Sequence, residues 1–494
     1  MAHYPLLLQD YNCNVLLTSG LPCHKQSNLH YLNTMKIVNK KTTIQLLITS
    51  LFALNLTACD SQQETIVDKK QVVKLQGPAT GVLTDSAVEG VSYAAASGAS
   101  GITDATGLYK FNHGDSVEFR IGKLNLGKIN ATGLTTAIEL AAGDQNKLLN
   151  LLILFQSLDA DNDPNNGISI PLAAADALDA SLDLKTDPAN FSNSPALAAA
   201  REAASIPGSI KTADEANTHF LSQAVNLLGS HLWVNQDDTS LNFFRFSTDG
   251  SGEYLHGIAT PDDSCDANRS CGSKLVFTAG VEYGTAKAVE YDERGFKLVS
   301  TTEVDTDLQS GLSHPRPKWR IYTDGNELII SDIVIVQRER KQASLFGELF
   351  HISEPLQLSS DDEVAETTVQ EIRYPRMNNS ESIVGAWTAN KDSIKSPVFL
   401  FFPDNRYMLV DPTGNATQSA PAACAKPGVE LATYSFDPAS STLKLSSFTY
   451  NTAGCAGLSG HDGKPITFKI DGNAQNATLS GNGLAPISLQ RISN

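Results

Sequence analysis

Side chains that could bind a metal ion are concentrated in one short stretch, LDADNDPNNGI, at residues 158–168. Three aspartates and an asparagine occupy alternate positions: Asp159, Asp161, Asp163 and Asn165. Oxygen ligands at this spacing converge when the chain curls, as they do at the start of calcium-binding loops. The stretch differs from an EF-hand, because Pro164 stands in place of the glycine and Ile170 in place of the bidentate glutamate. Calcium bound by these four residues is one expectation, and an Asx-rich turn after a helix is the other.

Motifs of common enzyme classes are absent from the sequence. It has no G-x-S-x-G, H-E-x-x-H or P-loop motif, and no G-x-G-x-x-G after an expected strand. The histidines are scattered along the chain. We therefore expect a protein that is not an enzyme and that needs no cofactor other than the calcium considered above.

The cysteines indicate export and a lipid anchor. Met35 opens a lysine-bearing segment followed by an apolar tract, the layout of a signal peptide. The tract ends in Leu-Thr-Ala-Cys, at Cys59, and this box resembles the lipobox of bacterial lipoproteins. The resemblance implies cleavage before Cys59 and lipid on its sulfur; an ordinary signal peptide beside a chance cysteine is the alternative. We expect residues 1–34 to be an upstream extension, residues 35–58 the signal peptide and residues 59–77 a tether.

Four of the seven cysteines remain in the exported part, as two well-separated pairs. An even number of cysteines in an exported chain favours disulfides. We expect the pairs Cys265–Cys271 and Cys424–Cys455. Zinc is the alternative, although neither pair has C-x-x-C spacing.

The charge of the chain argues against nucleic acid as a partner. The sequence has 37 basic and 54 acidic residues, a net charge of −17. Residues 1–58 contain four lysines and one aspartate, a charge of +3, so the exported part carries −20. An acidic surface repels nucleic acid and anionic lipid headgroups. The hydrophobic content of 41% is that of a globular chain rather than a disordered one.

The first part of the exported chain is expected to be β and then helical. Short alternating runs broken by Gly and Asp predict strands over residues 78–142. The run TDATGLYKF resembles a hairpin of small transthyretin-like sandwiches, which implies that Tyr109 and Phe111 pack inward. Over residues 143–228 the apolar period becomes that of helices, with a capping box at Thr212 and Glu215.

The rest of the chain is expected to be β and repeats itself. Trp233 opens one copy and Trp387 the other, and three tripeptides recur in the same order: GVE at 280 and 428, GLS at 311 and 457, and DGN at 324 and 471. The step from GVE to GLS is 31 residues in one copy and 29 in the other. We predict two homologous antiparallel modules, 229–357 and 380–494, joined by a linker at 358–379.

Tryptophan and arginine suggest the architecture of each module. The second copy opens with Gly-Ala-Trp at Trp387 and ends near Arg491, which resembles lipocalin-like (calycin-like) barrels. In that family an arginine packs across the tryptophan, which implies the pairs Trp387–Arg491 and Trp233–Arg338. The alternative is that each tryptophan is only a core anchor of a barrel or sandwich. The expected fold is thus mainly β with a small helical region.

The order of the parts carries a wider resemblance. A transthyretin-like domain followed by an LDADxDPxNGI segment resembles proteobacterial envelope lipoproteins that are often labelled adhesins. This implies a non-enzymatic protein of the bacterial cell envelope, lipid-anchored at the outer membrane or at the periplasmic face of a membrane, with a role in adhesion, surface interaction or assembly. A lipocalin-like lipoprotein that binds a small ligand is the alternative. The expected partners are the membrane, through the lipid, and a protein, a glycan or a small apolar ligand.

Overall fold

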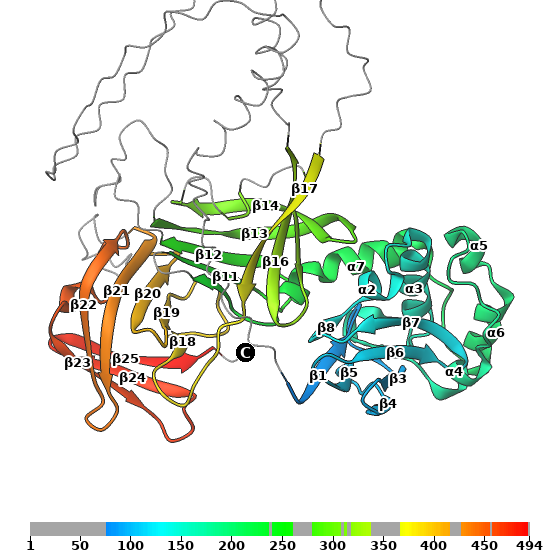
Figure 1. Cartoon of the computed structure of the whole chain (residues 1–494), viewed down its shortest axis with the longest axis horizontal. Helices are drawn as coiled ribbons and strands as arrows, with labels where there is room; N and C mark the ends of the chain where they lie inside the picture. Colours follow the sequence, from blue (N-terminus) through cyan, green and yellow to red (C-terminus); the bar gives the residue numbers. More distant parts are fainter. Residues whose placement is uncertain are drawn as a thin grey trace, which may run out of the picture. The chain divides into compact units, whose positions relative to one another are not determined.

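The structure is a computed structural model, which describes residues 76–236, 240–259, 279–307, 311–313, 318–336, 366–414, 426–454 and 457–492. Within these ranges the protein is mainly β with a small helical region, as predicted (Figure 1). A β-sandwich is followed by helices and then by two eight-stranded modules in tandem. Among the described residues, no helix has the length and apolar character needed to cross a membrane.

The N-terminal domain is a sandwich of two sheets. One sheet contains β1 (Pro78–Leu83), β5 (Leu108–Asn112) and β8 (Leu134–Thr135). The other contains β3 (Ser92–Ala95), β4 (Ser100–Ile102), β6 (Ser116–Ile121) and β7 (Leu124–Asn130). Asp104 shapes the turn before β5, because its Oδ1 accepts hydrogen bonds from the backbone N–H of Thr106 at 2.9 Å and of Leu108 at 3.1 Å. Tyr109 and Phe111 are buried between the sheets, with ring centroids 5.6 Å apart.

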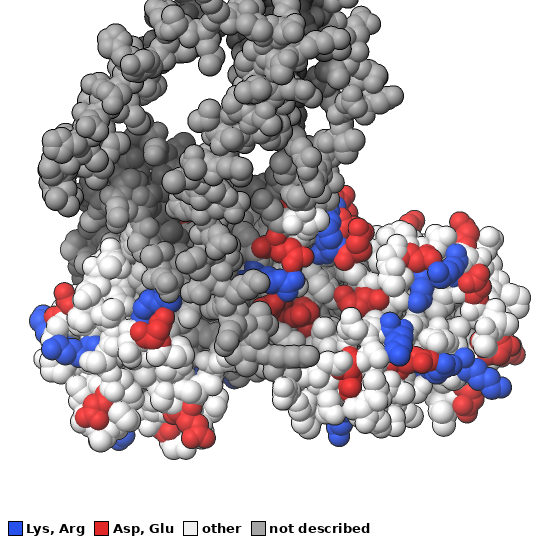
Figure 2. Space-filling model, viewed as in Figure 1, with Lys and Arg blue, Asp and Glu red and all other residues white. Residues whose placement is uncertain are grey.

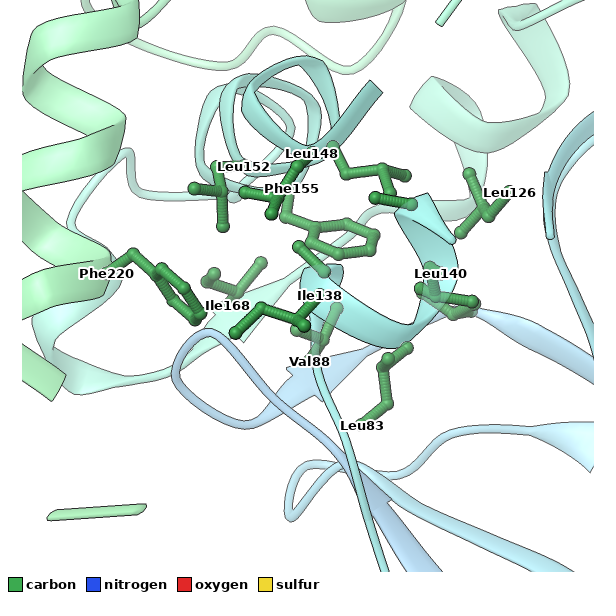
Figure 3. Packing of buried hydrophobic residues seen from close by; sticks show 14 of the residues in the cluster. Leu83, Val88, Leu126, Ile138, Leu140, Leu148, Leu152, Phe155, Ile168 and Phe220 are labelled. Atoms are coloured by element: carbon green, nitrogen blue, oxygen red, sulfur yellow. The ribbon is translucent and has the colours of Figure 1, made fainter. Parts of the chain in front are cut away.

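Helices pack against this sandwich and extend its core. They are α2 (Ala137–Ala141), α3 (Gln145–Ser157), α4 (Leu172–Ala177), α5 (Pro188–Ser192), α6 (Pro195–Ala203) and α7 (Ala213–Leu228). The predicted capping box of Thr212 and Glu215 starts α7. A second capping box, Thr136 and Glu139, starts α2 inside the region predicted to be β. Figure 3 shows Leu152 and Phe155 of α3 packed near Ile138 and Ile168. Ile168 belongs to β9 (Ile168–Ser169), which pairs with β2 (Val88–Glu89).

The first module is one antiparallel sheet with its strands in chain order. The strands are β10 (Trp233–Gln236), β11 (Leu241–Phe246), β12 (Glu253–Ala259), β13 (Ala279–Asp292), β14 (Gly295–Asp305), β15 (Arg320–Thr323), β16 (Glu327–Val336) and β17 (Glu366–Pro375). A backbone bridge between Trp233 and Arg376 joins the first and last strands. The predicted linker at 358–379 therefore contains the last strand, and the first copy extends beyond residue 357. Ten consecutive residue pairs between β16 and β17 hold this strand in the sheet.

The second module is a closed barrel. Its strands are β18 (Gly385–Thr388), β19 (Val398–Phe401), β20 (Arg406–Asp411), β21 (Gly428–Asp437), β22 (Thr442–Asn451), β23 (Pro465–Ile470), β24 (Asn476–Gly481) and β25 (Leu484–Arg491). The barrel closes where Trp387 pairs with Arg491. Closure leaves no unpaired sheet edge among the described strands of this module.

Equivalent bonds close the two modules. The Met377 N–H donates to the Leu232 carbonyl at 2.8 Å in the first module, and the Ile492 N–H donates to the Ala386 carbonyl at 3.0 Å in the second. The indole N–H of each tryptophan donates to a backbone carbonyl a few residues earlier, that of Trp233 at 2.6 Å and that of Trp387 at 2.8 Å. The modules are thus two copies of one fold, as the repeated tripeptides predicted.

Candidate functional site

A buried glutamate explains two of the repeated tripeptides. In the second module Glu430, the last residue of its GVE, lies fully buried on β21. It accepts hydrogen bonds from the Tyr407 hydroxyl at 3.2 Å and from the backbone N–H of Leu458 at 2.7 Å and Ser459 at 3.1 Å. Leu458 and Ser459 belong to GLS, and a Cβ on Gly457 would collide with the Glu430 carboxylate. The glutamate therefore holds the GLS loop against the barrel, and burial raises its pKa.

The first module contains the same arrangement. The Tyr254 hydroxyl donates to Oε1 of Glu282 at 2.5 Å, and the N–H groups of Leu312 and Ser313 donate to the same oxygen at 2.8 and 3.0 Å. Burial raises the pKa of Tyr254 above its ordinary range, and the neighbouring Glu282 raises it further. This tyrosine–glutamate–loop contact belongs to the shared scaffold of the two modules.

The modules differ beside this glutamate. In the first module Asp305 faces Glu282 across the β13–β14 pair, and Asp307 follows two residues later. One carboxylate oxygen from each of these three residues lies within 4.8 Å of the other two. We call Glu282, Asp305 and Asp307 the carboxylate cluster. In the second module Asn451 faces Glu430, and Ala453 takes the place of Asp307.

Buried oxygens of the carboxylate cluster lack hydrogen-bond partners. Oε2 of Glu282 and Oδ1 of Asp307 are both buried, and neither has a partner within the part of the chain that the structure describes. Both oxygens of Glu430, by contrast, accept hydrogen bonds. Asp305 is exposed and lies at the outer side of the carboxylate cluster. The carboxylate cluster thus has the all-oxygen donor set that hard divalent cations bind.

A buried histidine orients the cluster. Nδ1 of His256 lies 2.8 Å from Oδ2 of Asp307, and its Nε2 lies 2.7 Å from the side-chain amide oxygen of Asn242. The Phe244 ring packs on the imidazole, with centroids 4.4 Å apart. In the second module Leu409 stands at the place of His256, two residues after the scaffold tyrosine. The contact between His256 and Asp307 therefore occurs only in the first of the two modules.

The Asp-rich loop is organised by its own hydrogen bonds. Asp161 accepts hydrogen bonds from the Asp163 N–H at 3.0 Å and from the Asn166 side-chain amide at 2.9 Å. Asp163 accepts from the Asn165 N–H at 3.2 Å and from its side-chain amide at 2.8 Å. Asp159 is buried, accepts from the Ser169 N–H at 2.9 Å, and has its pKa raised to about 6, chiefly by burial.

These contacts are the Asx turns of the alternative expectation. Among the described residues, the carboxylate cluster is the one group of three acidic, histidine or cysteine side chains with metal-ligand spacing, and the Asp-rich loop does not form another. Calcium at Asp159, Asp161, Asp163 and Asn165 stays a prediction.

The remaining predicted residues divide into two groups. The Arg491 guanidinium lies 4.0 Å from the Trp387 ring centroid, the contact that the calycin resemblance implied. Arg338 lies outside the described residues, and the residue that pairs with Trp233 is Arg376. All the cysteines with expected roles also lie outside the described residues, so lipidation and both disulfides stay predictions: Cys59, Cys265, Cys271, Cys424 and Cys455.

Two features were missed by sequence reasoning. The carboxylate cluster with His256 could have been noticed by comparing the copies around GVE, since Asp305 and Asp307 have no acidic counterparts in the second copy. Arg376 could have been found from its apolar neighbour Met377, because Arg491 is likewise followed by Ile492.

Acidic and basic side chains are interspersed on the visible face of the sandwich and the helices (Figure 2). Lys185 and Asp144 form an ion pair, with Nζ and Oδ2 3.3 Å apart. No protein-family model, curated protein or solved structure matches the chain. Function is therefore inferred from the residues themselves.

Proposed function

We propose that the protein is a non-enzymatic lipoprotein of the bacterial cell envelope, whose β modules serve adhesion, surface interaction or assembly. The observation that carries this proposal is the filled interior of the second barrel. It favours recognition at the outer surface of the module over the capture of a small ligand inside it.

Aromatic side chains occupy the space that a ligand would need. Trp387, Phe401, Tyr407 and Phe468 are all buried. The ring centroid of Phe468 lies 5.3 Å from that of Trp387 and 5.5 Å from that of Phe401, and the Phe401 and Tyr407 centroids are 5.3 Å apart. A small-molecule carrier needs a cavity of about 300–1,000 Å³. The alternative, a lipocalin-like carrier, has less support for this reason.

The buried histidine of the first module supports a non-enzymatic role. A general base needs a ring nitrogen within reach of a substrate or nucleophile. Both nitrogens of His256 are already bonded, one to Asp307 and one to Asn242. The imidazole is also covered by Phe244. Its arrangement suits a structural or ligand-orienting residue better than a catalytic one.

The lipid anchor rests on the signal-peptide layout and on the lipobox that ends at Cys59. Cells that express the full chain and are fed an alkyne analogue of palmitate test it. The wild-type protein should carry the label in the membrane fraction, and Cys59→Ser should remove it. Cys13→Ser, in the predicted upstream extension, is the matched control and should leave labelling unchanged. Label that persists in Cys59→Ser would reject the anchor.

Attachment of the same cells to protein-coated and glycan-coated surfaces tests the proposed role. Cells with the wild-type chain should attach more strongly than cells with Cys59→Ser, because the variant is not held at the membrane. Equal attachment of both, with the label lost as expected, would contradict a role in adhesion. Saturable binding of an apolar fluorescent probe, one per module, would instead favour the carrier.

A further inference from the structure

We propose that the first module binds a hard divalent cation at the carboxylate cluster, through Glu282, Asp305 and Asp307, and that the second module has no such site. This inference goes beyond the proposed function and holds whether or not the chain carries lipid. Calcium is the first ion to test, followed by magnesium and manganese.

The first step is the convergence of charge. Three carboxylates, each offering an oxygen within 4.8 Å of the other two, come from β13, the end of β14 and the residues just after it. Glu282 and Asp307 are buried, so solvent does not screen their repulsion. A cation bound between like charges this close would offset their repulsion. The donor set is all oxygen, which favours calcium, magnesium or manganese over zinc.

The second step concerns the two oxygens without partners. Buried polar atoms almost always have a hydrogen-bond partner, so each exception asks for a physical cause. Oε2 of Glu282 and Oδ1 of Asp307 are two such exceptions within the described part of the chain. Their companion oxygens have partners: Tyr254 and the GLS loop donate to Oε1 of Glu282, and Oδ2 of Asp307 is hydrogen-bonded to His256. A cation bound at the carboxylate cluster would be a partner for such oxygens.

The third step is the internal comparison. The second module keeps Glu430 and its tyrosine, yet has Asn451, Ala453 and Leu409 where the first has Asp305, Asp307 and His256. In that module both oxygens of the glutamate have donors. The fold therefore does not require the extra carboxylates. Their presence in the first module alone indicates a ligand rather than a scaffold role.

The fourth step is the support around the ligands. Residues that hydrogen-bond a ligating side chain fix its orientation. His256 supplies this support to Asp307 and is itself held by Asn242 and covered by Phe244. Asp305 is exposed and gives the site a side open to water, from which a calcium ion would complete its six to eight oxygens.

A manganese titration followed by electron paramagnetic resonance tests the site in the exported chain, residues 59–494 with Cys59→Ser for solubility. One tightly bound manganese ion that calcium displaces is expected. Asp305→Asn combined with Asp307→Ala copies the second module and should weaken binding at least 10-fold. Its melting temperature should no longer rise with calcium, whereas that of the parent chain should.

Two controls keep the outcome interpretable. Asp161→Asn, in the Asp-rich loop, should retain the manganese site, so that ions bound there are distinguished. If the double variant does not fold, Asp305→Asn alone, at an exposed position, should still weaken binding. Undiminished binding in the aspartate variants, loss of binding in Asp161→Asn, or no binding by the parent chain would overturn the proposal.

Discussion

Arg491 shows how a single side chain closes a barrel. Its guanidinium lies over the Trp387 ring and donates hydrogen bonds to three backbone carbonyls, those of Ala474 at 2.6 Å, Val384 at 2.8 Å and Ser382 at 2.6 Å. Burial lowers its pKa below the ordinary arginine value, but an arginine remains charged in a protein. One residue thus satisfies the carbonyls at the point where the first and last strands meet.

Arg491→Ala should therefore destabilise the second module strongly. Loss of the charged hydrogen bonds and of the cation–π contact is expected to lower the free energy of unfolding by about 2–4 kcal/mol. Arg491→Lys should recover only part of this, because an ammonium cannot reach three carbonyls at once. Urea unfolding measures the change, and Lys469→Ala, at an exposed position on β23, is the control. A loss below about 1 kcal/mol would contradict this account.

Asp159 should make stability depend on pH. Burial raises its pKa from an ordinary 3.8 to about 6, so the folded state binds a proton more tightly than the unfolded state does. Its contribution to stability is fully present below about pH 4 and is lost as the pH rises through 6. Between pH 4 and 7 the wild type should lose stability relative to Asp159→Asn, measured by urea unfolding with a chelator present.

Asp161 provides a control of opposite sign for that measurement. A hydrogen bond from Asn166, followed by that from the Asp163 backbone, lowers its pKa. Its contribution is present above the unfolded pKa and is lost as the pH falls. Below about pH 4 the wild type should lose stability relative to Asp161→Asn. Parallel pH profiles for the two variants would show that burial of Asp159 is not the cause.

At the scale of elements, β17 decides where the first module ends. It pairs with β16 over its whole length, and the bridge of Arg376 to Trp233 brings it beside β10. Tyr374 is buried, and its ring meets that of Phe244 edge-on at 5.3 Å, whereas Ile372, two residues earlier in the strand, is 52% exposed. If residues 366–375 are a strand of the module, the Tyr374 side chain contributes to stability and the Ile372 side chain contributes little. If they are a linker, neither side chain contributes much.

Tyr374→Ala should cost about 3–5 kcal/mol of unfolding free energy, the usual loss for a buried aromatic side chain. Ile372→Ala, two residues away, should change it by only about 0.5 kcal/mol, since its side chain is largely in solvent. Urea unfolding of the exported chain compares the two variants. Similar small effects for both would mean that residues 366–375 behave as a linker after all.

At the scale of the whole molecule, the modules share a core. Buried residues of both modules form one hydrophobic cluster, which includes Leu255 on β12 and Val410 on β20. Arg245 of the first module donates hydrogen bonds to the Ser393 carbonyl, at 3.1 Å, and to the Lys391 carbonyl of the second. Gly257 lets the two modules approach each other closely, because a Cβ at this position would lie 2.7 and 2.8 Å from the Val410 methyl groups.

Gly257→Ala should thus destabilise the protein by overpacking, by about 1–3 kcal/mol. Val410→Ala makes room for the added methyl group, so the double variant should be more stable than the sum of the single losses predicts. The expected coupling is about 0.5–3 kcal/mol, measured by a double-mutant cycle in urea. Strict additivity would show that the two side chains do not meet and that the modules do not share this contact.

The sequence by itself determined the order of the parts and the duplication. The order of the parts depends on segments whose residues act locally, such as the helical period of α3 and the capping box of Thr212 and Glu215, and the duplication depends on the recurrence of the GVE, GLS and DGN tripeptides. Each tripeptide marks a turn or a buried contact that the fold needs in both copies, such as Glu430 with its GLS loop. Local periods, caps and repeated tripeptides can be recognised in the sequence without knowing which distant residues they contact.

Only the tertiary structure decided where the first module ends and which polar residues meet. Residues 337–365 separate β16 from β17, whereas two residues separate β24 from β25. The last strands of the two copies are therefore not equally spaced in the sequence. Comparison of the sequences alone therefore aligned Gln337-Arg338 with Gln490-Arg491. His256, Glu282 and Asp307 come from separate parts of the module and meet through the pairing of β12, β13 and β14. Strand register decides such meetings, and burial across the whole sheet sets the register.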